Sequence, residues 1–153
     1  MEAVILIGIQ ATGKSTFYAQ RFADSHVRIN LDMLKTRPRE ERLLMQCIRE
    51  RKPFVVDNTN VLARERARYI SAAKGAGYQV IGYFFEANLT DALERNKQRE
   101  GKAAIPWKGV VAKFRALQRP RYAEGFDRLF IVSIGTNSEF AVRDWQEEPD
   151  DGL

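Results

Sequence analysis

The chain has 153 residues, of which 44% are hydrophobic and 29% are charged, and its formal net charge is +5. This length supports one domain with a real core, and the composition is that of a globular protein rather than a disordered or fibrous one. The longest apolar runs are only a few residues, which excludes a membrane span, so we expect no membrane partner.

The chain alternates short apolar runs with amphipathic segments. Strands are predicted at Val4–Ile7, Val27–Asn30, Phe54–Asp57, Val80–Phe85 and Leu129–Ile134. Helices are predicted at Lys14–Ala23, Arg39–Arg51, Arg64–Lys74, Leu89–Gln98 and Val110–Gln118. This order predicts an α/β fold with a doubly wound, mostly parallel five-stranded sheet and helices on both faces. Phe140–Trp145 is a candidate for an appended strand.

The first predicted strand runs directly into a glycine-rich loop from Gly8 to Ser15, which fits the phosphate-binding pattern G-x-x-x-x-G-K-S/T. In this motif the backbone N–H groups and the following helix N-terminus point at phosphate oxygens. Lys14 reaches the terminal phosphates, and the Ser15 hydroxyl can bind Mg²⁺. The P-loop therefore predicts binding of ATP or GTP with magnesium. The residues expected to hold the nucleotide are Gly8, Gln10, Ala11, Thr12, Gly13, Lys14, Ser15 and Thr16.

Two carboxylates follow the next two predicted strands. In a parallel sheet that flanks the P-loop strand, both are expected near the γ-phosphate of the nucleotide. Asp57, directly after an apolar strand, is a degenerate Walker-B acid and a candidate partner for Mg²⁺ or its water. Asp32 is the natural general base for an acceptor hydroxyl. The alternative for either carboxylate is a helix N-cap, and for Asp32 this is suggested by the Met33-Leu34 pair that follows it.

Several stretches between Val4 and about Ile134 carry a family resemblance. They are Gly8–Thr16, Ile29–Asp32, Val56–Asn60, Arg64–Tyr69, Arg95–Arg99 and Ala123–Phe126. In these stretches the chain resembles the polynucleotide 5′-hydroxyl kinase family, the kinase module of nucleic-acid end-healing enzymes, among AAA-type P-loop kinase-like proteins. The Asp-Asn-Thr-Asn element at residues 57–60 is the most specific of them after the P-loop.

The resemblance implies ATP-dependent phosphorylation of the 5′-OH end of DNA or RNA. Asp32 would deprotonate the hydroxyl, Lys14 and Ser15 would handle the phosphates and Mg²⁺, and Asp57 would support the active site. The resemblance also implies a short helical lid in which Arg95 and Arg99 clamp the transferring phosphoryl group. Their i, i+4 spacing puts both on one helix face, where cations stabilise developing charge, although a solvated helix face is the alternative.

Lys35 departs from the pattern of the family. At this position, three residues after the base, the family often has an arginine that holds the 3′-phosphate of the acceptor. Lysine keeps the charge but loses the bidentate fork, so it would meet an acceptor phosphate as a point charge only. Asn58 and Asn60 are the other candidates for substrate contact, because they combine turn chemistry with hydrogen bonding. No Asp-x-Asp-x-Thr phosphatase motif occurs, so we expect a lone kinase module.

Two other functions stay open. Kinases of small molecules, such as sugar nucleotides or antibiotics, share this plan and often the aspartate base. A nucleotide-dependent regulatory module would hydrolyse ATP slowly without any acceptor, but it would not need a positioned base and lid arginines. Binding of single-stranded nucleic acid separates the first alternative from a polynucleotide kinase.

The charges are distributed unevenly along the chain. Residues 95–128 hold ten lysines or arginines against three acids, which suits a polyanionic ligand or a solvated face. Residues 146–153 hold four acids and are expected to form a disordered tail beyond a kinase domain at 1–145. The single Cys47 is expected in the core and fits a reducing, cytoplasmic setting. No partner protein can be inferred from the sequence.

Overall fold

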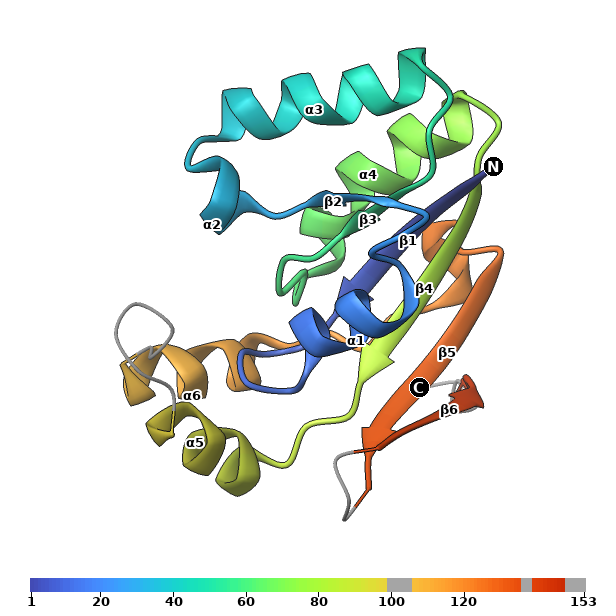
Figure 1. Ribbon diagram of the computed structural model, residues 1–153. Coiled ribbons are helices and arrows are strands. Elements are labelled where there is room, and N and C mark those ends of the chain that lie inside the picture. The colour runs from blue at the N-terminus through green and yellow to red at the C-terminus, as the bar shows by residue number, and fades with distance from the viewer. Residues whose placement is uncertain (99–105, 136–138, 148–153) are drawn as a thin grey trace.

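A six-stranded sheet with helices on both faces forms the domain, in a computed structural model that describes residues 1–98, 106–135 and 139–147 (Figure 1). The strands are β1 (Glu2–Ile7), β2 (Val27–Ile29), β3 (Phe54–Val56), β4 (Gln79–Phe85), β5 (Arg128–Ile134) and β6 (Phe140–Asp144). The helices are α1 (Lys14–Arg21), α2 (Leu31–Leu34), α3 (Arg37–Arg49), α4 (Ala63–Gly75), α5 (Leu89–Lys97) and α6 (Trp107–Ala116), with a 3-10 turn η2 at Tyr122–Glu124. The predicted α/β fold is therefore confirmed.

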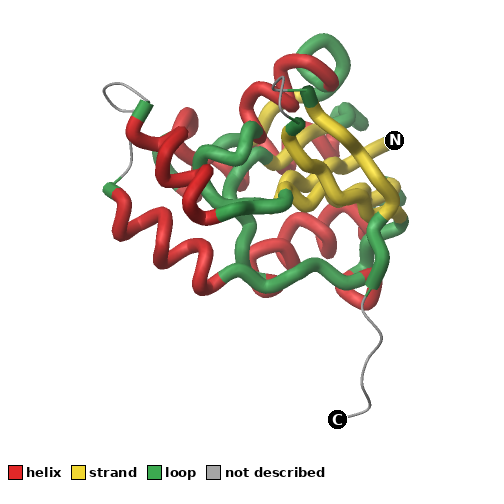
Figure 2. Tube along the Cα trace, turned by 90° about the horizontal axis from the view of Figure 1, so that it is seen from below, coloured by secondary structure: helices red, strands yellow, loops and turns green. Residues whose placement is uncertain are grey.

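The strand order is β2-β3-β1-β4-β5-β6, and every neighbouring pair except β5 and β6 is parallel. Seen from below, the strands form one layer with helices on either side (Figure 2). Because β1 lies in the middle of the sheet, its carboxyl end delivers the glycine-rich loop to the centre of one sheet edge. Ligands bind at this edge in open α/β sheets.

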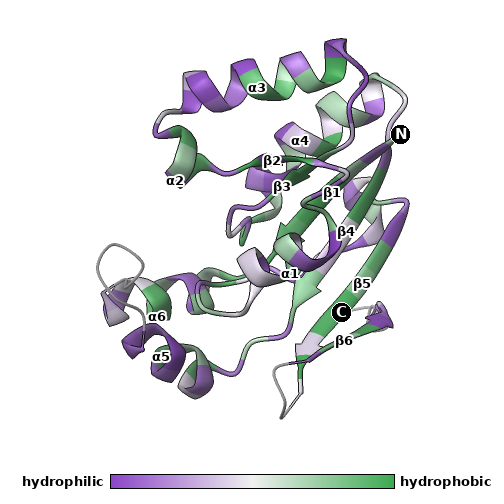
Figure 3. Ribbon diagram, in the orientation of Figure 1, coloured by the Kyte–Doolittle hydropathy of each residue, from purple (hydrophilic) through white to green (hydrophobic). Residues whose placement is uncertain are grey.

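The successive side chains of β1 point to opposite faces of the sheet, as the pleat of a strand requires. Ala3, Ile5 and Ile7 join a core with residues of α3 and α4, which includes the buried Cys47 that the sequence placed there. Val4 and Leu6 join a second core with aromatic residues of α1. In the hydropathy view β1 is green over most of its length, whereas much of α3 and α5 is purple (Figure 3).

The five-strand expectation was one strand short, because Phe140–Asp144 pairs antiparallel with β5 as the appended-strand candidate had suggested. The Phe140 ring packs edge-on against Phe17, with 5.3 Å between centroids. It also lies against Gly13, where an added Cβ would be 2.9 Å from the ring. The edge strand thus supports the P-loop from the side.

The predicted helices are confirmed to within three residues, with the largest difference at the start of α6, which begins at Trp107 rather than Val110. Short helix α2 was not expected. Helices α5 and α6 pack together beside the carboxyl edge of the sheet, where Ile9, Val61, Ala92 and Val110 form a third buried cluster. In the described part of the chain, no helix combines the length and apolar character that crossing a membrane requires.

The structure bears only partly on the expected acidic tail. The Glu147 carboxylate accepts a hydrogen bond from the backbone N–H of Tyr122, on η2. The remaining tail residues, 148–153, lie outside the described residues, so the division into a domain and a tail stays a prediction.

Candidate active site

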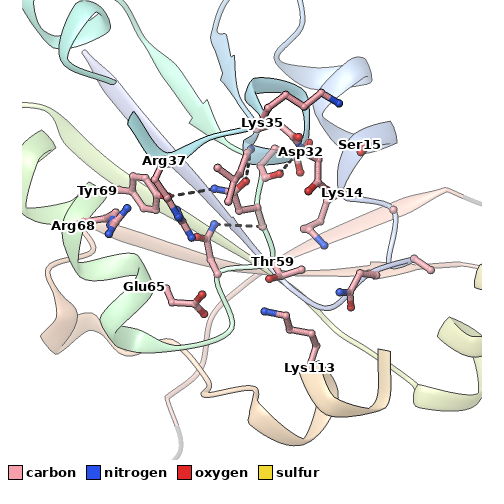
Figure 4. A pocket seen from close by; sticks show the side chains of 18 of the residues that line it. Lys14, Ser15, Asp32, Lys35, Arg37, Thr59, Glu65, Arg68, Tyr69 and Lys113 are labelled. Carbon is pink, nitrogen blue, oxygen red and sulfur yellow. Dashed lines mark hydrogen bonds between the residues drawn. The ribbon is translucent and has the colours of Figure 1, made fainter. Parts of the chain in front are cut away.

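A cavity of about 1020 Å³ opens at the carboxyl edge of the sheet, and two walls enclose it. The P-loop wall consists of Gln10, Ala11, Gly13, Lys14, Ser15 and Thr16. The helical wall is built from α2, the start of α3, α4, α6 and neighbouring turns. It consists of Asp32, Lys35, Arg37, Arg64, Glu65, Arg68, Tyr69 and Lys113. Residues 57–60, after β3, line the floor between them. Figure 4 shows Lys14, Ser15 and Asp32 on one side and Arg37, Arg68 and Tyr69 on the other, with Lys113 reaching in from α6.

The P-loop wall is held in shape by its own side chains. The Lys14 amine donates to the backbone carbonyls of Gly8 at 2.8 Å and Ile9 at 2.7 Å. The Thr12 hydroxyl also donates to Ile9, at 2.8 Å. Gly13, at φ 93°, is the N-cap of α1 in the left-handed region, which favours glycine. The loop therefore curls around the lysine that is expected to reach the phosphates.

Asp57 and Ser15 are connected by an arginine that the sequence analysis did not single out. Asp57 is 4% exposed, and its Oδ2 accepts hydrogen bonds from Arg28 Nε at 2.9 Å and Nη2 at 2.6 Å. The same Nη2 donates to Ser15 Oγ at 3.0 Å. Burial raises the pKa of Asp57, while the bonds and charge of Arg28 and the charge of Lys14 oppose that rise.

The oxygens of Ser15 and Asp57 fit a magnesium ion that arrives with a nucleotide. In phosphotransfer sites Mg²⁺ is usually held by one or two carboxylates together with substrate phosphates, not by an all-protein cage. Among the described residues, no three His, Cys, Asp or Glu side chains gather into a potential metal cage. One hydroxyl and one carboxylate are the donor set expected for an ion that is shared with phosphates.

Asp32 lies in the first turn of α2 and lines the cavity. The N-cap of this helix is Asn30, whose Oδ1 accepts from the Met33 N–H at 3.0 Å, so the alternative that Asp32 is the cap is wrong. A second amide fixes the helix, because the Leu31 N–H donates to Asn58 Oδ1 at 2.8 Å. The carboxylate of Asp32 is thus exposed to the cavity on a helix that two asparagines hold.

The three candidates for substrate contact all line the cavity. Lys35 ends α2 with a positive φ of 77° and an exposed side chain. The Asn58 amide donates to Glu40 Oε2 at 2.9 Å, and the 3% exposed Asn60 donates to the Leu6 carbonyl at 2.8 Å. Asn58 is therefore bonded to α3, and Asn60 is bonded to β1. The substrate roles of all three residues stay predictions.

A buried carboxylate, Glu40 on α3, organises the region behind Asp32. It is 2% exposed, and its Oε1 accepts from the Tyr69 hydroxyl at 2.9 Å and Arg37 Nη1 at 2.8 Å. Arg68 Nη1 lies 3.7 Å from the same oxygen, and Asn58 binds the other. Burial, followed by the adjacent negative charge of Glu40, raises the pKa of Tyr69 to about 12. This Glu40 network joins α3 and α4 to the turn that positions α2.

A fully buried arginine ties α4 of the helical wall to neighbouring loops. Arg66 on α4 is 0% exposed and binds Glu124 through Nε at 2.8 Å and Nη2 at 3.0 Å. Its Nη1 donates to the carbonyls of Asn60 at 2.9 Å, Gln118 at 3.0 Å and Val61 at 3.3 Å. The side chain thereby joins α4, the turn after β3 and the segment after α6.

Arg28, Glu40 and Arg66 were missed for different reasons. Arg66 lies in one of the stretches that carried the family resemblance, so its position was noted without a role. Arg28 is a charged residue in the middle of a short strand, which is a weak signal for a role at the site. Nothing in the sequence around Glu40 distinguishes it from a surface residue of an amphipathic helix, because only tertiary packing buries it.

The two lid arginines are not both visible in the structure. Arg95 is exposed in the last turn of α5 and is not among the residues that line the cavity, while Arg99 lies outside the described residues. Lys113 of α6 lines the cavity instead. Together with Lys35, Arg37, Arg64 and Arg68 it gives the helical wall five cations against two acids. This balance suits an anionic ligand.

Comparisons with known proteins agree with this geometry. The sequence profile of a family described as an AAA domain matches residues 35–122, which is more than half of the chain. The bifunctional polynucleotide phosphatase/kinase of Schizosaccharomyces pombe is 32% identical over 74 residues. These residues make up 48% of this chain but only 18% of that protein, so the similarity spans less than a fifth of the relative.

Solved structures match over most of the chain. A gluconokinase from Sinorhizobium meliloti 1021 superposes with a TM-score of 0.61 and 19% identity, over 88% of this chain and 83% of its own. The AvrRxo1-ORF1:-ORF2 complex with ATP gives a TM-score of 0.69 at 17% identity, over 92% of this chain and 57% of the other. At these identities the similarity establishes the fold, which is that of P-loop kinase-like proteins.

Proposed function

We propose that the chain is an ATP-dependent kinase. The proposal starts from two facts: the chain belongs to the family described as an AAA domain, and it has a P-loop kinase-like, ATP-binding fold. It transfers the γ-phosphate of ATP to a hydroxyl group, and the acceptor is the 5′-OH end of a polynucleotide. Transfer to an alcohol requires a phosphate cradle, a carboxylate to take the proton, and charge stabilisation around the phosphoryl group.

One observation carries the proposal: a single cavity is lined both by the P-loop and by Asp32, which lies on the same side as Lys14 and Ser15 (Figure 4). In the reaction, the acceptor oxygen forms a bond to the γ-phosphorus while the bond to the β,γ-bridging oxygen breaks, and ADP leaves. The hydroxyl proton passes to the Asp32 carboxylate. Lys14 binds the phosphates of ATP, and the backbone donors of residues 8–16 cradle them.

The remaining groups stabilise charge. Ser15 and Asp57 would hold magnesium, which when bound neutralises phosphate charge. We assign to Arg95 and Arg99 the clamp on the transferring group, and to Lys113 a similar role from α6, since it lines the cavity. Preorganised cations at the position where charge develops can change the rate by orders of magnitude.

The choice of acceptor rests on two observations. The helical wall carries five cations, which suits the phosphodiester chain next to a 5′-OH. The relative that shares 32% identity over 74 residues is named as a polynucleotide phosphatase/kinase. Lys35, Asn58 and Asn60 are the residues we assign to the acceptor, Lys35 through its charge and the asparagines through the turn that they shape.

The test is transfer of labelled γ-phosphate from Mg·ATP to short oligonucleotides with a 5′-OH, as DNA and as RNA, for the wild type and Asp32→Asn. We expect label on an oligonucleotide for the wild type and roughly 10²–10⁴ less for the variant, as for a lost general base. An oligonucleotide that already carries a 5′-phosphate is the matched control and should stay unlabelled. Equal labelling by the variant would remove Asp32 from the mechanism.

A small-molecule hydroxyl is the second candidate acceptor, and Lys35 favours it because the bidentate arginine of polynucleotide kinases is replaced there. ATP binding without label on any oligonucleotide would select this candidate. The acceptor search would then turn to phosphorylated sugars and nucleotides, which the cations of the helical wall would bind.

A further inference from the structure

Arg28 places a positive charge directly between the two side chains expected at the magnesium site. Its Nη2 lies 2.6 Å from Asp57 Oδ2 and 3.0 Å from Ser15 Oγ, and its Nε adds a second bond to the same carboxylate oxygen at 2.9 Å. The guanidinium thus bridges a residue after β3 and the first turn of α1. Neither the strand pairing nor the P-loop motif requires a cation at this point.

The arginine is held at the site and yet open to solvent. Its guanidinium carbon lies 5.2 Å from the centre of the Tyr18 ring, a cation–π distance, and the Tyr18 hydroxyl is itself bonded to the carbonyl of His26 at 3.1 Å. The Arg28 side chain is 24% exposed, whereas that of Asp57 is 2% exposed. A ligand can therefore reach the arginine, whose two hydrogen bonds already occupy Oδ2 of the nearly buried Asp57 carboxylate.

A guanidinium and a divalent cation cannot share these oxygens without repelling each other. Two like charges a few ångströms apart interact strongly wherever water is partly excluded, and the repulsion doubles for a divalent ion. A nucleotide changes this balance, because its phosphates bring negative charge that pairs with the metal and offers the guanidinium another acceptor. The pairing of Arg28 therefore distinguishes a metal that arrives alone from one that arrives with ATP.

We propose that Arg28 is a built-in counter-ion that keeps free divalent metal out of the Ser15–Asp57 site, so that magnesium enters only together with ATP. This role rests on the proposed use of Mg·ATP. Arg28 is then a positioning residue and not a catalytic one. It also explains how a buried carboxylate can stay paired between catalytic cycles, since an unpaired buried charge is costly.

The test measures Mn²⁺ binding to the full chain without nucleotide, by electron paramagnetic resonance of the free ion, so that no phosphoryl transfer is involved. We expect weak binding for the wild type and at least about tenfold tighter binding for Arg28→Gln, which frees the carboxylate. Arg28→Lys, which keeps the positive charge, should stay close to the wild type. In Arg28→Gln combined with Asp57→Asn the gain should disappear.

Arg21 offers a matched control, because it also stacks on an aromatic ring, with its guanidinium carbon 4.9 Å from the centre of Phe17. Arg21→Gln removes the same charge without touching Ser15 or Asp57, and we expect its Mn²⁺ affinity to equal that of the wild type. Circular dichroism checks that each variant is folded. Arg28→Met, which keeps an aliphatic contact with Tyr18, replaces Arg28→Gln if the latter unfolds.

Three outcomes would overturn the proposal: no tighter Mn²⁺ binding in Arg28→Gln and Arg28→Met, an equal gain in Arg21→Gln, or a gain that survives removal of the Asp57 charge. Failure of the proposed function is a separate result, because it would appear as absence of phosphoryl transfer with the metal titration unaffected.

Discussion

The two walls of the cavity are built on different principles. The P-loop wall comes from one short stretch, residues 10–16, and its loop is shaped by contacts within residues 8–14. The helical wall collects side chains from residue 32 to residue 113, and the Glu40 network behind it joins three segments far apart in the chain. A phosphate cradle can thus be encoded locally, whereas a positioned base depends on the tertiary structure.

The largest effects should come from one substitution in each wall. Lys14→Met removes a charge that acts on ATP in both the ground state and the transition state, so we expect weaker ATP binding and a turnover loss of about 10²-fold or more. Asp32→Asn should cost roughly 10²–10⁴ in turnover while ATP affinity stays unchanged, because only the acceptor proton is affected. Calorimetric ATP titration and steady-state rates measure the two quantities. ATP binding lost in both variants would contradict a division of labour between the walls.

Arg66 joins α4 to the turn after β3 and to the segment after α6, and its loss should be the largest purely structural effect. Arg66→Met leaves Glu124 without its ion-pair partner and three carbonyl groups without the guanidinium donor, and breaking a buried ion pair in this way costs about 3–5 kcal/mol of unfolding free energy. Urea denaturation measures the loss. Arg68→Met, on the same helix with its side chain 49% exposed, is the matched control and should cost under about 1 kcal/mol. Equal losses of unfolding free energy in Arg66→Met and Arg68→Met would show that the burial of Arg66 adds nothing to stability.

The difference between the walls explains what the sequence could predict. The P-loop, the strand that precedes it and the order of elements follow from local patterns, because apolar periodicity and glycine positions act over a few residues. Asp32 and Asp57 were placed correctly at one sheet edge because the carboxyl ends of parallel strands meet there. The sixth strand was also within reach, because Phe140–Trp145 already stood as a candidate for an appended strand.

The rest depends on contacts that no local pattern encodes. Whether Glu40 is solvated or buried is decided by Tyr69 and Asn58, which are distant in sequence. The N-cap of α2 was not predicted at Asn30, because Asn30 belongs to the predicted strand Val27–Asn30. Only the structure shows the Asn30 side chain accepting from the Met33 N–H. The pairing of Arg28 with Asp57 likewise required the register of β2 beside β3.

Glu40→Gln tests whether the position of the helical wall depends on the Glu40 network. The substitution keeps the size of the side chain but removes the charge to which Arg37 and Tyr69 bind, and weakening such charge-assisted bonds costs about 1–3 kcal/mol. Turnover should fall because the turn that carries Asn58 and α2 loosens, while ATP affinity stays that of the wild type. Unfolding free energy, turnover and ATP affinity are measured on one preparation. A drop in ATP affinity equal to the drop in turnover would show that the walls are not separable.

The smallest effect, the titration of Tyr69, appears only in alkaline solution. The pKa of Tyr69 is raised from 10.0 to about 12, first by burial and then by Glu40, so the folded chain holds the phenolic proton more tightly than the unfolded chain. The stabilisation is therefore fully present below pH 10 and is lost as the pH rises from about 10 to 12, where only the unfolded state has released the proton. Tyr69→Phe should be less stable than the wild type by about 1 kcal/mol at pH 9, through the lost hydrogen bond.

This stability difference should narrow toward pH 11, because the phenylalanine variant has no proton to lose. Burial also raises the pKa values of Tyr78 and Tyr83, but they titrate equally in both proteins and cancel in the comparison. Tyr122→Phe is the matched control, since Tyr122 is 42% exposed and lies outside the Glu40 network, and its loss of stability at pH 9 should be smaller. Urea denaturation at pH 9 and pH 11 measures the stability difference between the wild type and Tyr69→Phe at each pH. A constant gap for Tyr69→Phe would mean that the hydroxyl is not held against Glu40 in solution, and the side-chain network that positions α2 would have to be reassigned.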